Sequence, residues 1–322
     1  MSAEQPVHVT LGLGKHTAVK ALIDGTVKPH GIELTCLCDF PEPSVIVMFD
    51  RILNGELDGG EMSLSFYTQG KLKGAPFIGI PVFPFRSFRH RSIYIRDGAG
   101  IKAPADLKGK RIGLHSYSAS TMTWVRGILR DDYGVHPRDI SWHTILDRGI
   151  EGAKRSGVSV DVIPSPGPGV DLIEYVADMI ERSELDGGVS PADMTRPGIS
   201  RLFPNFAEVE GDYYRRTGIF PIIHTLVLNE RIVRQTPWVT ASLLDSFRKA
   251  ASLTPQYVAA GELQRWDKET WEVDRPILAG DDPFACRLGA KERRTVEAFL
   301  DYLLLDGAIA TKPSVDVLFP VS

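Results

Sequence analysis

The chain has 322 residues, which is long for one hydrophobic core and favours two lobes. Its 37 basic and 41 acidic residues give a formal net charge of −4, which argues against a general nucleic-acid-binding surface. Hydrophobic residues make up 43% of the chain, yet no apolar run approaches the roughly 18 residues that cross a bilayer. Residues 1–6 lack the basic and apolar regions of a secretory signal. Either the protein is cytoplasmic or a signal was removed, and the methionine at position 1 favours a cytoplasmic protein.

Strand and helix patterns alternate along the chain, which predicts an α/β fold with a mainly parallel sheet. We expect a strand at 7–11, a helix at 17–24, a strand at 32–38, a helix at 45–54 and a strand at 60–64. After a polar break at 98–104 we expect a helical turn at 104–110, a strand at 111–114, a helix at 118–133 that Gly134 ends, a loop at 156–169 and a helix at 172–182. The remainder is mostly helical, with segments at 227–233, 238–251 and 293–305.

The three cysteines favour structural roles. Cys36 and Cys38 lie two apart in a predicted strand, so both thiols share one face. A metal site would need further ligands close by, and the usual Cys-x-x-Cys spacing is absent. Cys286 stands alone and is expected to be inert. Because the chain shows no compact set of metal ligands, we expect no metal.

An internal repeat supports two lobes of like topology. The sequence Glu-Leu-Asp-Gly-Gly occurs at 56–60 and again at 184–188. Each copy follows a predicted helix and leads within a few residues to a serine, Ser63 or Ser190. We interpret the copies as two equivalent strands that each deliver a serine to a shared cleft. The chain would then cross between the lobes near the arginine-rich segment described next and again near 220–226.

Residues 83–92, here called the arginine segment, hold three arginines and a histidine between aromatic residues. If the chain is extended from Arg86, side chains alternate, so Arg86 and His90 share one face while Arg89 and Arg91 share the other. Arginine forks bind carboxylates and phosphates through two parallel hydrogen bonds. The segment is therefore either an anion clamp inside a cleft or a solvated edge strand whose arginines meet acidic neighbours.

Several motifs in a row resemble one known family. They lie at 61–65, 80–84, 88–90, 106–111, 124–129, 201–204, 213–214 and 217–224. Together they resemble the 4,5-dihydroxyphthalate decarboxylase family, and the resemblance runs from about residue 8 to the C-terminus. The motif at 106–111 is shared with many type II solute-binding proteins, whereas the arginine segment and the motif at 218–224 are far more specific.

The resemblance implies the fold of type II periplasmic binding proteins, in which two α/β lobes are joined by two crossing strands and hold the ligand in the cleft between them. We place one lobe at 1–95 plus 220–322 and the other at 96–219. The resemblance also implies a cofactor-independent, non-oxidative decarboxylase whose small-molecule partner is a hydroxylated, phthalate-like aromatic carboxylate. The rival prediction is a solute-binding protein that holds such an anion. A homo-oligomer is left open.

Decarboxylation of an aromatic ring needs a proton carrier, which the sequence supplies as histidine. Imidazole titrates nearest to working pH, so His90, His115 and His224 are the candidate proton carriers. Glu61 ends a predicted strand just before Ser63 and is the candidate base for a phenol. Any one of these histidines could instead be structural, and Glu61 could be the buried partner of an arginine.

The residues expected to bind substrate are cationic, hydroxylic or aromatic side chains in or beside these motifs. They are Arg86, Arg89, Arg126, Ser63, Ser65, Ser116, Ser118, Tyr67 and Trp124. Each also has a structural interpretation, since an arginine can reach solvent from an apolar helix face, a serine can cap a helix and an aromatic ring can be core. Residues 12–17 resemble a phosphate-binding loop only superficially, and we interpret them as a strand-to-helix turn that lines the cleft.

One departure from the family pattern affects this site. After the strand at 111–114, familiar members tend to read Pro-Glu-Tyr-Gln, whereas this chain places His115 and Ser116 there. A serine in place of a carboxylate makes the site more cationic. We therefore expect a substrate related to 4,5-dihydroxyphthalate and proton handling that relies on histidine.

Overall fold

The structure is a computed structural model that describes residues 5–41 and 44–320, and in it the chain forms two compact units. The first unit comprises the described parts of Met1–Ser87, Ile222–Arg293 and Ser314–Ser322. The second comprises Phe88–Pro221 and Arg294–Pro313. The chain therefore changes unit four times, at 87/88, 221/222, 293/294 and 313/314. The first two changes lie close to the crossings predicted near the arginine segment and near 220–226, and the last two bring 294–313 into the second unit.

The segment Arg294–Pro313 belongs to the second unit, whereas the sequence predicts it in the first lobe. Its side chains explain the difference, because Phe299 packs on Trp124 with ring centroids 5.3 Å apart and Asp306 pairs with Arg126 at 2.5 Å. Nothing in the local sequence of an amphipathic helix specifies which core it will cover.

The first unit is built on a five-stranded sheet with the order β2-β1-β3-β11-β4. Its strands are β1 (Val7–Gly12), β2 (Ile32–Leu37), β3 (Gly59–Ser63), β4 (Phe77–Ile80) and β11 (His224–Asn229). β1 pairs in parallel with β2 and β3, whereas β11 runs antiparallel to β3 and β4. The strand that returns from the second unit thus lies inside this sheet, beside the central β3.

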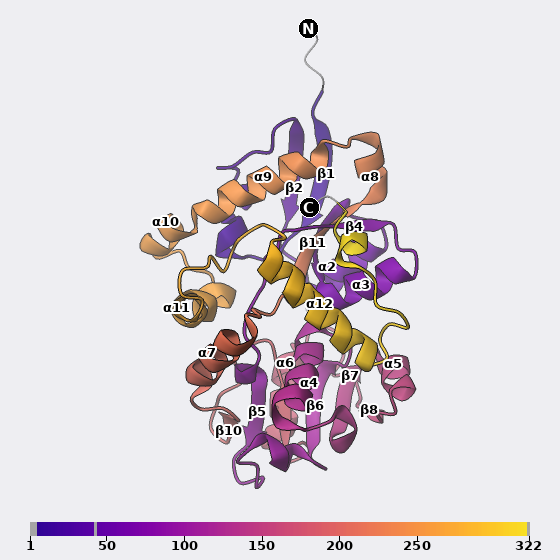
Figure 1. The fold of residues 1–322 in the computed structure, drawn as a ribbon, viewed down its shortest axis with the longest axis vertical. Helices are drawn as coiled ribbons and strands as arrows, with labels where there is room; N and C mark the ends of the chain where they lie inside the picture. The colour runs from indigo at the N-terminus through magenta and orange to yellow at the C-terminus, as the bar shows by residue number, and fades with distance from the viewer. Residues whose placement is uncertain (1–4, 42–43, 321–322) are drawn as a thin grey trace. The chain divides into compact units, whose positions relative to one another are not determined.

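The first unit also contains helices, some of which pack on its sheet. They are α1 (Lys20–Ile23), α2 (Ser44–Leu53), α3 (Leu64–Leu72), α8 (Glu230–Gln235), α9 (Val239–Ser252), α10 (Thr254–Ala259), α11 (Arg275–Ile277) and α13 (Val315–Leu318), with short 3₁₀ or π turns at Thr17–Val19, Arg265–Asp267 and Thr270–Asp274. Figure 1 shows α9 lying across β1 and β2. Leu243 and Phe247 of α9 are buried in one core with Val9 and Leu11 of β1, so this helix seals the sheet through its apolar face.

The second unit has a six-stranded sheet with the order β10-β5-β9-β6-β7-β8. Its strands are β5 (Ile93–Arg96), β6 (Arg111–Ser116), β7 (Ser141–Leu146), β8 (Val160–Val162), β9 (Gly187–Val189) and β10 (Ile199–Arg201). Its helices are α4 (Ser120–Tyr133), α5 (Ile150–Arg155), α6 (Leu172–Glu181), α7 (Phe206–Thr217) and most of α12 (Ala290–Leu305), with 3₁₀ turns at His90–Ser92, Pro104–Leu107 and Pro137–Asp139. Gly134 ends α4 with φ 64°, which confirms the predicted stop.

The internal repeat marks equivalent places in the two sheets. Asp58 exchanges backbone and side-chain hydrogen bonds with Thr10 of β1, and Asp186 does the same with Arg111 of β6. The carbonyl of Asp58 accepts from Asn229 of β11, as that of Asp186 accepts from Arg96 of β5. In each unit the aspartate therefore fastens the start of a central strand to a parallel neighbour on one side and an antiparallel one on the other.

Two local predictions are wrong. The arginine segment is not one extended strand, because the backbone N–H of Ser92 bonds to the carbonyl of Arg89 and His90–Ser92 forms a 3₁₀ turn. The segment at 227–233 is not helical throughout, because it begins in β11 and turns helical only at Glu230. The apolar run at 226–228 is short, and short apolar runs do not distinguish strand from helix by periodicity alone.

The remaining sequence expectations concern thiols and membranes. Burial raises the pKa of Cys36 to about 12, that of Cys38 to about 11 and that of Cys286 to about 12, so all three are protonated thiols at neutral pH. Within 5–41 and 44–320, none of the helices is long and apolar enough to cross a membrane.

Candidate functional site

Four acidic and imidazole side chains form a continuous hydrogen-bonded chain in the first unit. Asp267 Oδ1 lies 3.1 Å from His16 Nδ1, and His16 Nε2 lies 3.1 Å from Glu61 Oε1. The same Glu61 oxygen lies 2.5 Å from His224 Nδ1. We call this row, Asp267–His16–Glu61–His224, the acid–imidazole chain.

The strands fix the Glu61 end of the acid–imidazole chain. Glu61 lies on the central strand β3 and pairs with Leu226 of β11, while His224 pairs with Ser63. His224 is therefore the diagonal neighbour of Glu61 on one face of the sheet, a spacing that long side chains can bridge. This pairing brings together two residues that the sequence selected separately.

A close backbone approach holds the other oxygen of Glu61. The backbone N–H of Gly14 donates to Glu61 Oε2 at 2.9 Å. A Cβ atom at position 14 would lie 2.8 Å from His16 Nε2 and 2.9 Å from Glu61 Oε2, so only glycine fits there without displacing these groups. The turn at 12–17, which follows strand β1, thus binds the carboxylate of Glu61 through the backbone of Gly14 and the side chain of His16.

A segment from the distant C-terminal part supplies Asp267. Its Oδ2 accepts from the backbone N–H of Thr17, and the backbone N–H of Gln264 donates to Thr17 Oγ1 at 3.0 Å. The hydroxyl of Thr270 donates to the carbonyl of Arg86. The 264–270 segment is therefore fastened both to the turn that carries His16 and to the end of the arginine segment.

Burial and charge decide the protonation states inside the chain. The side chains of His16, Glu61 and Asp267 are 5%, 2% and 2% exposed, and that of His224 is 13% exposed. Burial opposes a charge on Glu61, but the two imidazoles beside it hold the pKa of this carboxyl well below its usual range. Burial likewise opposes a charge on His16, but Glu61 and Asp267 raise its pKa well above the usual value. Glu61 and His16 are thus both charged inside the acid–imidazole chain. Of its four side chains, only that of His224 reaches the surface of the unit.

Aromatic rings surround the two imidazoles. Phe85 stacks on His16 with ring centroids 5.8 Å apart and meets the His224 ring edge-on at 5.4 Å. Phe49 contacts the other side of His224 at 5.3 Å, also edge-on. These rings limit the rotation of His224 and keep water from the buried hydrogen bonds, which strengthens the electrostatic interactions.

The other candidates of the first unit have structural contacts. Arg86 is 6% exposed and faces Glu292 Oε1 at 3.5 Å. The hydroxyl of Tyr67 donates to the carbonyl of Leu318 and accepts from the backbone of Gly79, which ties α3 to strand β4. Ser65 accepts from the side chain of Gln69 at 3.0 Å, one helical turn on. Their roles in substrate binding stay predictions.

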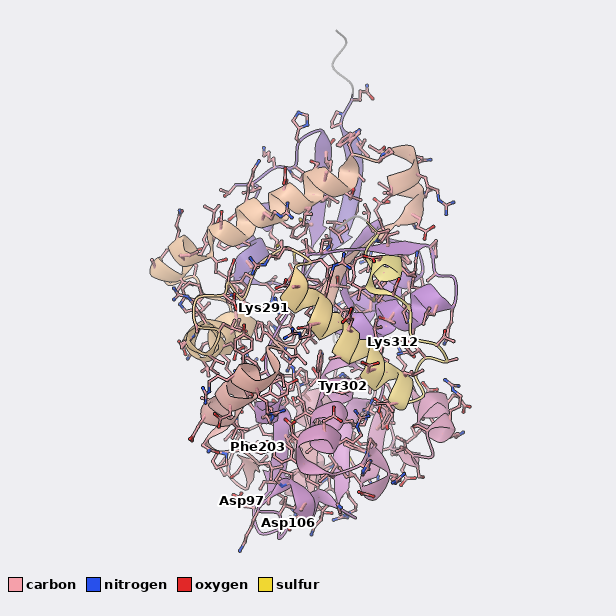
Figure 2. All side chains as sticks on the ribbon, viewed as in Figure 1. Asp97, Asp106, Phe203, Lys291, Tyr302 and Lys312 are labelled. Atoms are coloured by element: carbon pink, nitrogen blue, oxygen red, sulfur yellow. The ribbon has the colours of Figure 1, made fainter. Side chains whose placement is uncertain are left out.

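His90 lies in the second unit, enclosed by aromatic rings. It is 1% exposed and contacts Tyr213, Phe203 and Tyr133 with ring centroids 5.2, 5.5 and 6.1 Å away; Phe203 is labelled in Figure 2. Neither ring nitrogen has a hydrogen-bond partner among the described residues. Burial and the cations Arg216 and Arg91 lower the pKa of His90 to about 4, so it is neutral at working pH.

His90 should make the protein sensitive to acid. The unfolded state binds a proton near the usual pKa of 6.5, and the folded state only near 4, so stability falls as pH drops through this window and is undiminished above it. The full difference corresponds to about 3 kcal/mol. We expect His90→Phe to flatten the decline in urea-unfolding free energy between these pH values, whereas His30→Phe, at an exposed position, should retain the wild-type decline. An unchanged decline in His90→Phe would contradict this assignment.

The two arginines of the arginine segment that lie in the second unit, Arg89 and Arg91, are buried and make polar contacts. Arg91 pairs with Glu210 at 2.5 Å, and its backbone N–H also donates to that carboxylate. Arg89 is 1% exposed, and its Nη1 donates to Ser92 Oγ at 3.2 Å. The acidic-neighbour interpretation of the arginine segment therefore holds for Arg91, although the segment is a buried turn and not a solvated edge.

Arg126 and Trp124 of α4 both contact the segment 299–306, which comprises the end of α12 and the residue that follows it. Trp124 is fully buried against Phe299 and Tyr302, and Tyr302 is labelled on α12 in Figure 2. The guanidinium of Arg126 binds Asp306 and lies 3.8 Å from the centre of the Tyr117 ring. These contacts give both side chains a structural role. Their contact with substrate stays a prediction, which a separate experiment on Arg126 tests.

The family departure lies at the end of β6. His115 is half-buried, and burial lowers its pKa to about 4, so the imidazole is neutral at working pH. Ser116 is fully buried, and its hydroxyl has no hydrogen-bond partner within the described residues. Ser118 is 5% exposed, and its backbone N–H donates to Arg148. The predicted roles of these three residues in substrate binding and proton transfer stay predictions.

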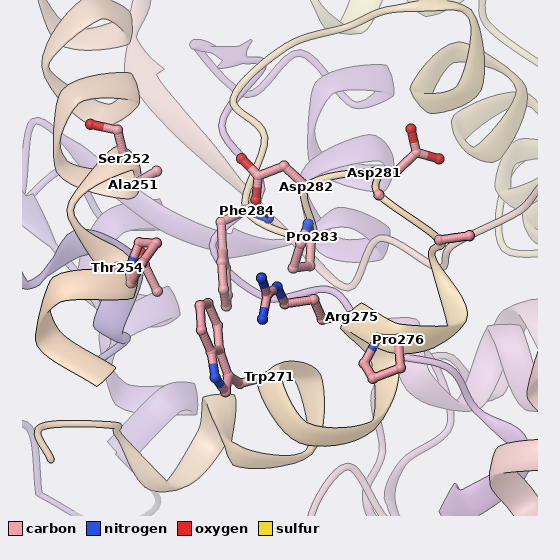
Figure 3. Close-up of a pocket in the computed structure, with 13 residues that line it drawn as sticks. Ala251, Ser252, Thr254, Trp271, Arg275, Pro276, Asp281, Asp282, Pro283 and Phe284 are labelled. Atoms are coloured by element: carbon pink, nitrogen blue, oxygen red, sulfur yellow. Dashed lines mark hydrogen bonds between the residues drawn. The ribbon is translucent and has the colours of Figure 1, made fainter. Parts of the chain in front are cut away.

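A cavity of about 560 Å³ opens elsewhere in the first unit. In Figure 3 the rings of Trp271 and Phe284 form one wall and the guanidinium of Arg275 lies beside them. Arg275 is 4.5 Å from the centre of the Trp271 ring. None of the candidate residues selected from the sequence lines this cavity, and none of the four residues of the acid–imidazole chain lines it either.

The sequence missed two members of the acid–imidazole chain, His16 and Asp267. His16 lies in a turn that the sequence marks by its glycines, and the interpretation of that turn as part of the cleft wall was the available signal. Asp267 stands in a charged stretch with no motif, 251 residues from His16. Across 5–41 and 44–320, no group of three or more His, Cys, Asp or Glu side chains is arranged to hold a metal ion.

Comparisons with known proteins place this geometry in context. No protein-family model matches the chain. A 4,5-dihydroxyphthalate decarboxylase from Comamonas testosteroni is 32% identical over 262 residues, which cover 77% of this chain and 76% of that protein. A protein of the same name from Pseudomonas putida is 32% identical over 220 residues, which cover 65% of this chain and 82% of that protein.

Solved structures show the fold. The periplasmic aliphatic sulphonate binding protein SsuA from Escherichia coli superposes with a TM-score of 0.58 at 13% identity, covering 98% of this chain and 92% of that one. This likeness confirms the periplasmic-binding-protein-like fold predicted from the sequence. It does not extend to ligand or activity, because one fold carries many functions.

Proposed function

Because the chain belongs to the 4,5-dihydroxyphthalate decarboxylase family, we propose that it removes one carboxylate, without oxidation, from 4,5-dihydroxyphthalate or a closely related hydroxylated aromatic acid. The observation that carries the proposal within the structure is the buried hydrogen bond between Glu61 and His224, whose imidazole alone in the acid–imidazole chain reaches the surface. The activity would serve the breakdown of phthalate-type aromatic compounds.

The chemistry explains why a proton donor is needed. When the bond between ring and carboxylate breaks, carbon dioxide leaves and the bonding electron pair stays on the ring carbon. A proton must take the vacated position, so each turnover consumes one proton and converts 4,5-dihydroxyphthalate into 3,4-dihydroxybenzoate. Each carboxylate of this substrate has a hydroxyl para to it, whose oxygen pushes electron density toward the carbon that accepts the proton. The protein therefore has to orient the ring and deliver a proton.

We assign proton delivery to His224. Its Nδ1 faces Glu61, which leaves Nε2 as the atom that can give a proton to the ring carbon and be reprotonated from solvent. The predicted role of Glu61 as a base for a phenol fits less well, since its two oxygens already accept hydrogen bonds from His16, His224 and Gly14. We therefore propose that Glu61 orients His224 and offsets its charge.

Turnover of a substrate panel tests the proposal. Purified protein is incubated with 4,5-dihydroxyphthalate, phthalate and several hydroxybenzoates, and carbon dioxide and the ring product are measured. We expect 3,4-dihydroxybenzoate from 4,5-dihydroxyphthalate with a kcat of roughly 1–10³ per second, and no product from phthalate, which lacks the para hydroxyl. If the acids bind in calorimetry but release no carbon dioxide, the solute-binding alternative, which shares this fold, replaces the decarboxylase.

The cytoplasmic location predicted from the sequence stays part of this proposal. An enzyme of aromatic breakdown works beside the pathways that use its product, whereas a solute-binding protein for uptake works outside the inner membrane. Fractionation of cells that express the native gene, with immunodetection of the protein in each fraction, decides between these locations.

A further inference from the structure

We infer that His16 and Asp267 form a positioning pair that holds Glu61 ionised and fixes which ring nitrogen of His224 exchanges protons. The inference rests on the proposed function for its catalytic consequence, but the protonation pattern that it assigns belongs to the protein alone. Neither residue is among those that the sequence selected.

His16 must carry a proton on both ring nitrogens. Each nitrogen faces a carboxylate oxygen at 3.1 Å, Nδ1 toward Asp267 and Nε2 toward Glu61. A carboxylate is only an acceptor, and a neutral imidazole has only one N–H, so only the imidazolium satisfies both contacts. Because the side chain is 5% exposed, solvent cannot take over either contact.

Glu61 then has no position left for a proton. Its Oε1 accepts from His16 and His224, and its Oε2 accepts from the backbone N–H of Gly14. Three donors on a buried carboxylate favour the charged form, and protonating it would leave a donor facing a donor. His224 must therefore donate through Nδ1–H to Glu61, so a neutral His224 is protonated at Nδ1 and gains or loses protons at Nε2.

The charges in the acid–imidazole chain sum to zero only when His224 carries a proton on both ring nitrogens. Two carboxylates and one imidazolium leave a net charge of −1 when His224 is neutral, and protonated His224 cancels it. The other groups that face the chain do not alter this count: Cys38 next to Glu61 has a pKa raised to about 11 and is neutral, and the rings of Phe49 and Phe85 that pack on His224 carry no charge. The positive charge of His16 thus weakens the electrostatic attraction between Glu61 and a proton on His224. The carboxylate of Asp267 in turn stabilises the positive charge of His16.

The first test reads protonation directly and needs no substrate. Protein with ¹⁵N-labelled histidine side chains is titrated by NMR, with each signal assigned by its loss in His16→Gln or His224→Gln. At pH 7 we expect both nitrogens of His16 to carry a proton, and Nδ1 of His224, which faces Glu61, to carry one as well. In Asp267→Asn, His16 should lose its second proton at a lower pH than in wild type. A neutral His16 at pH 7 in the wild-type protein would overturn the inference.

The second test reads the consequence for turnover. Asp267→Asn should lower kcat by about 10–100-fold with KM little changed, the effect typical of a carboxylate that orients a histidine from outside the reacting groups. Here Asp267 acts on His224 through His16 and Glu61. In His16→Gln the loss of a cation near His224 should move the alkaline decline of kcat to higher pH. A merely structural pair would lower thermal stability without moving that decline, which would also overturn the inference.

A matched control and an independent reading separate the two proposals. Asp39→Asn removes an exposed carboxylate that pairs with Lys15, the neighbour of His16, and should leave kcat and its pH profile as in wild type. If wild type decarboxylates none of the panel acids while His16 titrates as expected, the proposed function fails and the positioning pair stands. If turnover is normal but His16 is neutral, the positioning pair fails alone.

Discussion

His224→Gln is expected to lower kcat for 4,5-dihydroxyphthalate by about 10²–10⁴-fold, the usual contribution of a positioned proton donor. Glutamine can keep the contact with Glu61 through its amide N–H, but it carries no proton that it can give to carbon. Because the side chain is partly exposed and packs edge-on against Phe49 and Phe85, the substitution should change the unfolding free energy little. Carbon dioxide release under saturating substrate measures kcat, and circular dichroism measures folding.

His143→Gln is the matched control for this variant. His143 lies on β7, is 18% exposed and faces the carboxylate of Asp161 at 4.0 Å, so it resembles His224 in exposure and in having an acidic neighbour. We expect wild-type kcat from the control. Added imidazole should restore part of the activity of His224→Gly, since a free imidazole can occupy the vacated space and carry the proton. Wild-type kcat in His224→Gln would remove His224 from the chemistry.

Local patterning was sufficient for most elements that build the two sheets. Apolar alternation places β1, β2 and β3 within a residue or two, and helical spacing with a glycine stop places α4. The repeated Glu-Leu-Asp-Gly-Gly predicts equivalent strands, and Asp58 and Asp186 prove to make the same backbone contacts in the two units. Features such as these are encoded within about ten residues of the chain, so one sequence suffices to see them.

Features set by distant contacts were not predictable in the same way. The arginine segment turns at His90–Ser92, where the backbone and side chain of Arg91 are both bound by Glu210, 119 residues further on. Most of α12 packs on the second unit, because Phe299 and Tyr302 contact Trp124 there. The apolar face of this helix could equally well have packed on the core of the first unit, so the local sequence did not decide between the two. The sequence specifies that these side chains need partners but not which partners they meet.

The acid–imidazole chain shows the same division within one site. Glu61 and His224 could be selected because each lies in a motif on a predicted strand, and the strand pairing then joins them. Asp267 could not, because a single aspartate in a charged stretch has no periodicity or spacing that marks it. The buried cation of His16 between two carboxylates forms only when the segments that hold His16, Glu61 and Asp267 come together in the fold. None of these segments has a sequence motif that predicts it.

The second large effect is expected from Arg126. Its Nε and Nη2 donate to Asp306, at 3.0 and 2.5 Å, and its Nη1 donates to the carbonyl of Tyr117 at 2.8 Å. The Arg126 side chain is 2% exposed and that of Asp306 is 8% exposed. Arg126→Met would leave a buried carboxylate without its cation, which typically costs about 3–5 kcal/mol of unfolding free energy. Urea unfolding followed by tryptophan fluorescence and by circular dichroism measures this loss.

Two further variants separate the ion pair from a substrate clamp. Arg126→Met combined with Asp306→Leu removes both charges and should recover most of the lost stability, because a buried pair replaced by apolar side chains of similar size is often nearly neutral. Arg130→Met, one helical turn later, breaks a more exposed pair with Asp131 and should cost at most about 1 kcal/mol. If Arg126→Lys retains wild-type stability but raises KM, the guanidinium serves the substrate. If stability falls while KM holds in the folded fraction, Arg126 joins α4 to α12, and the carboxylates of the substrate must find their cation elsewhere.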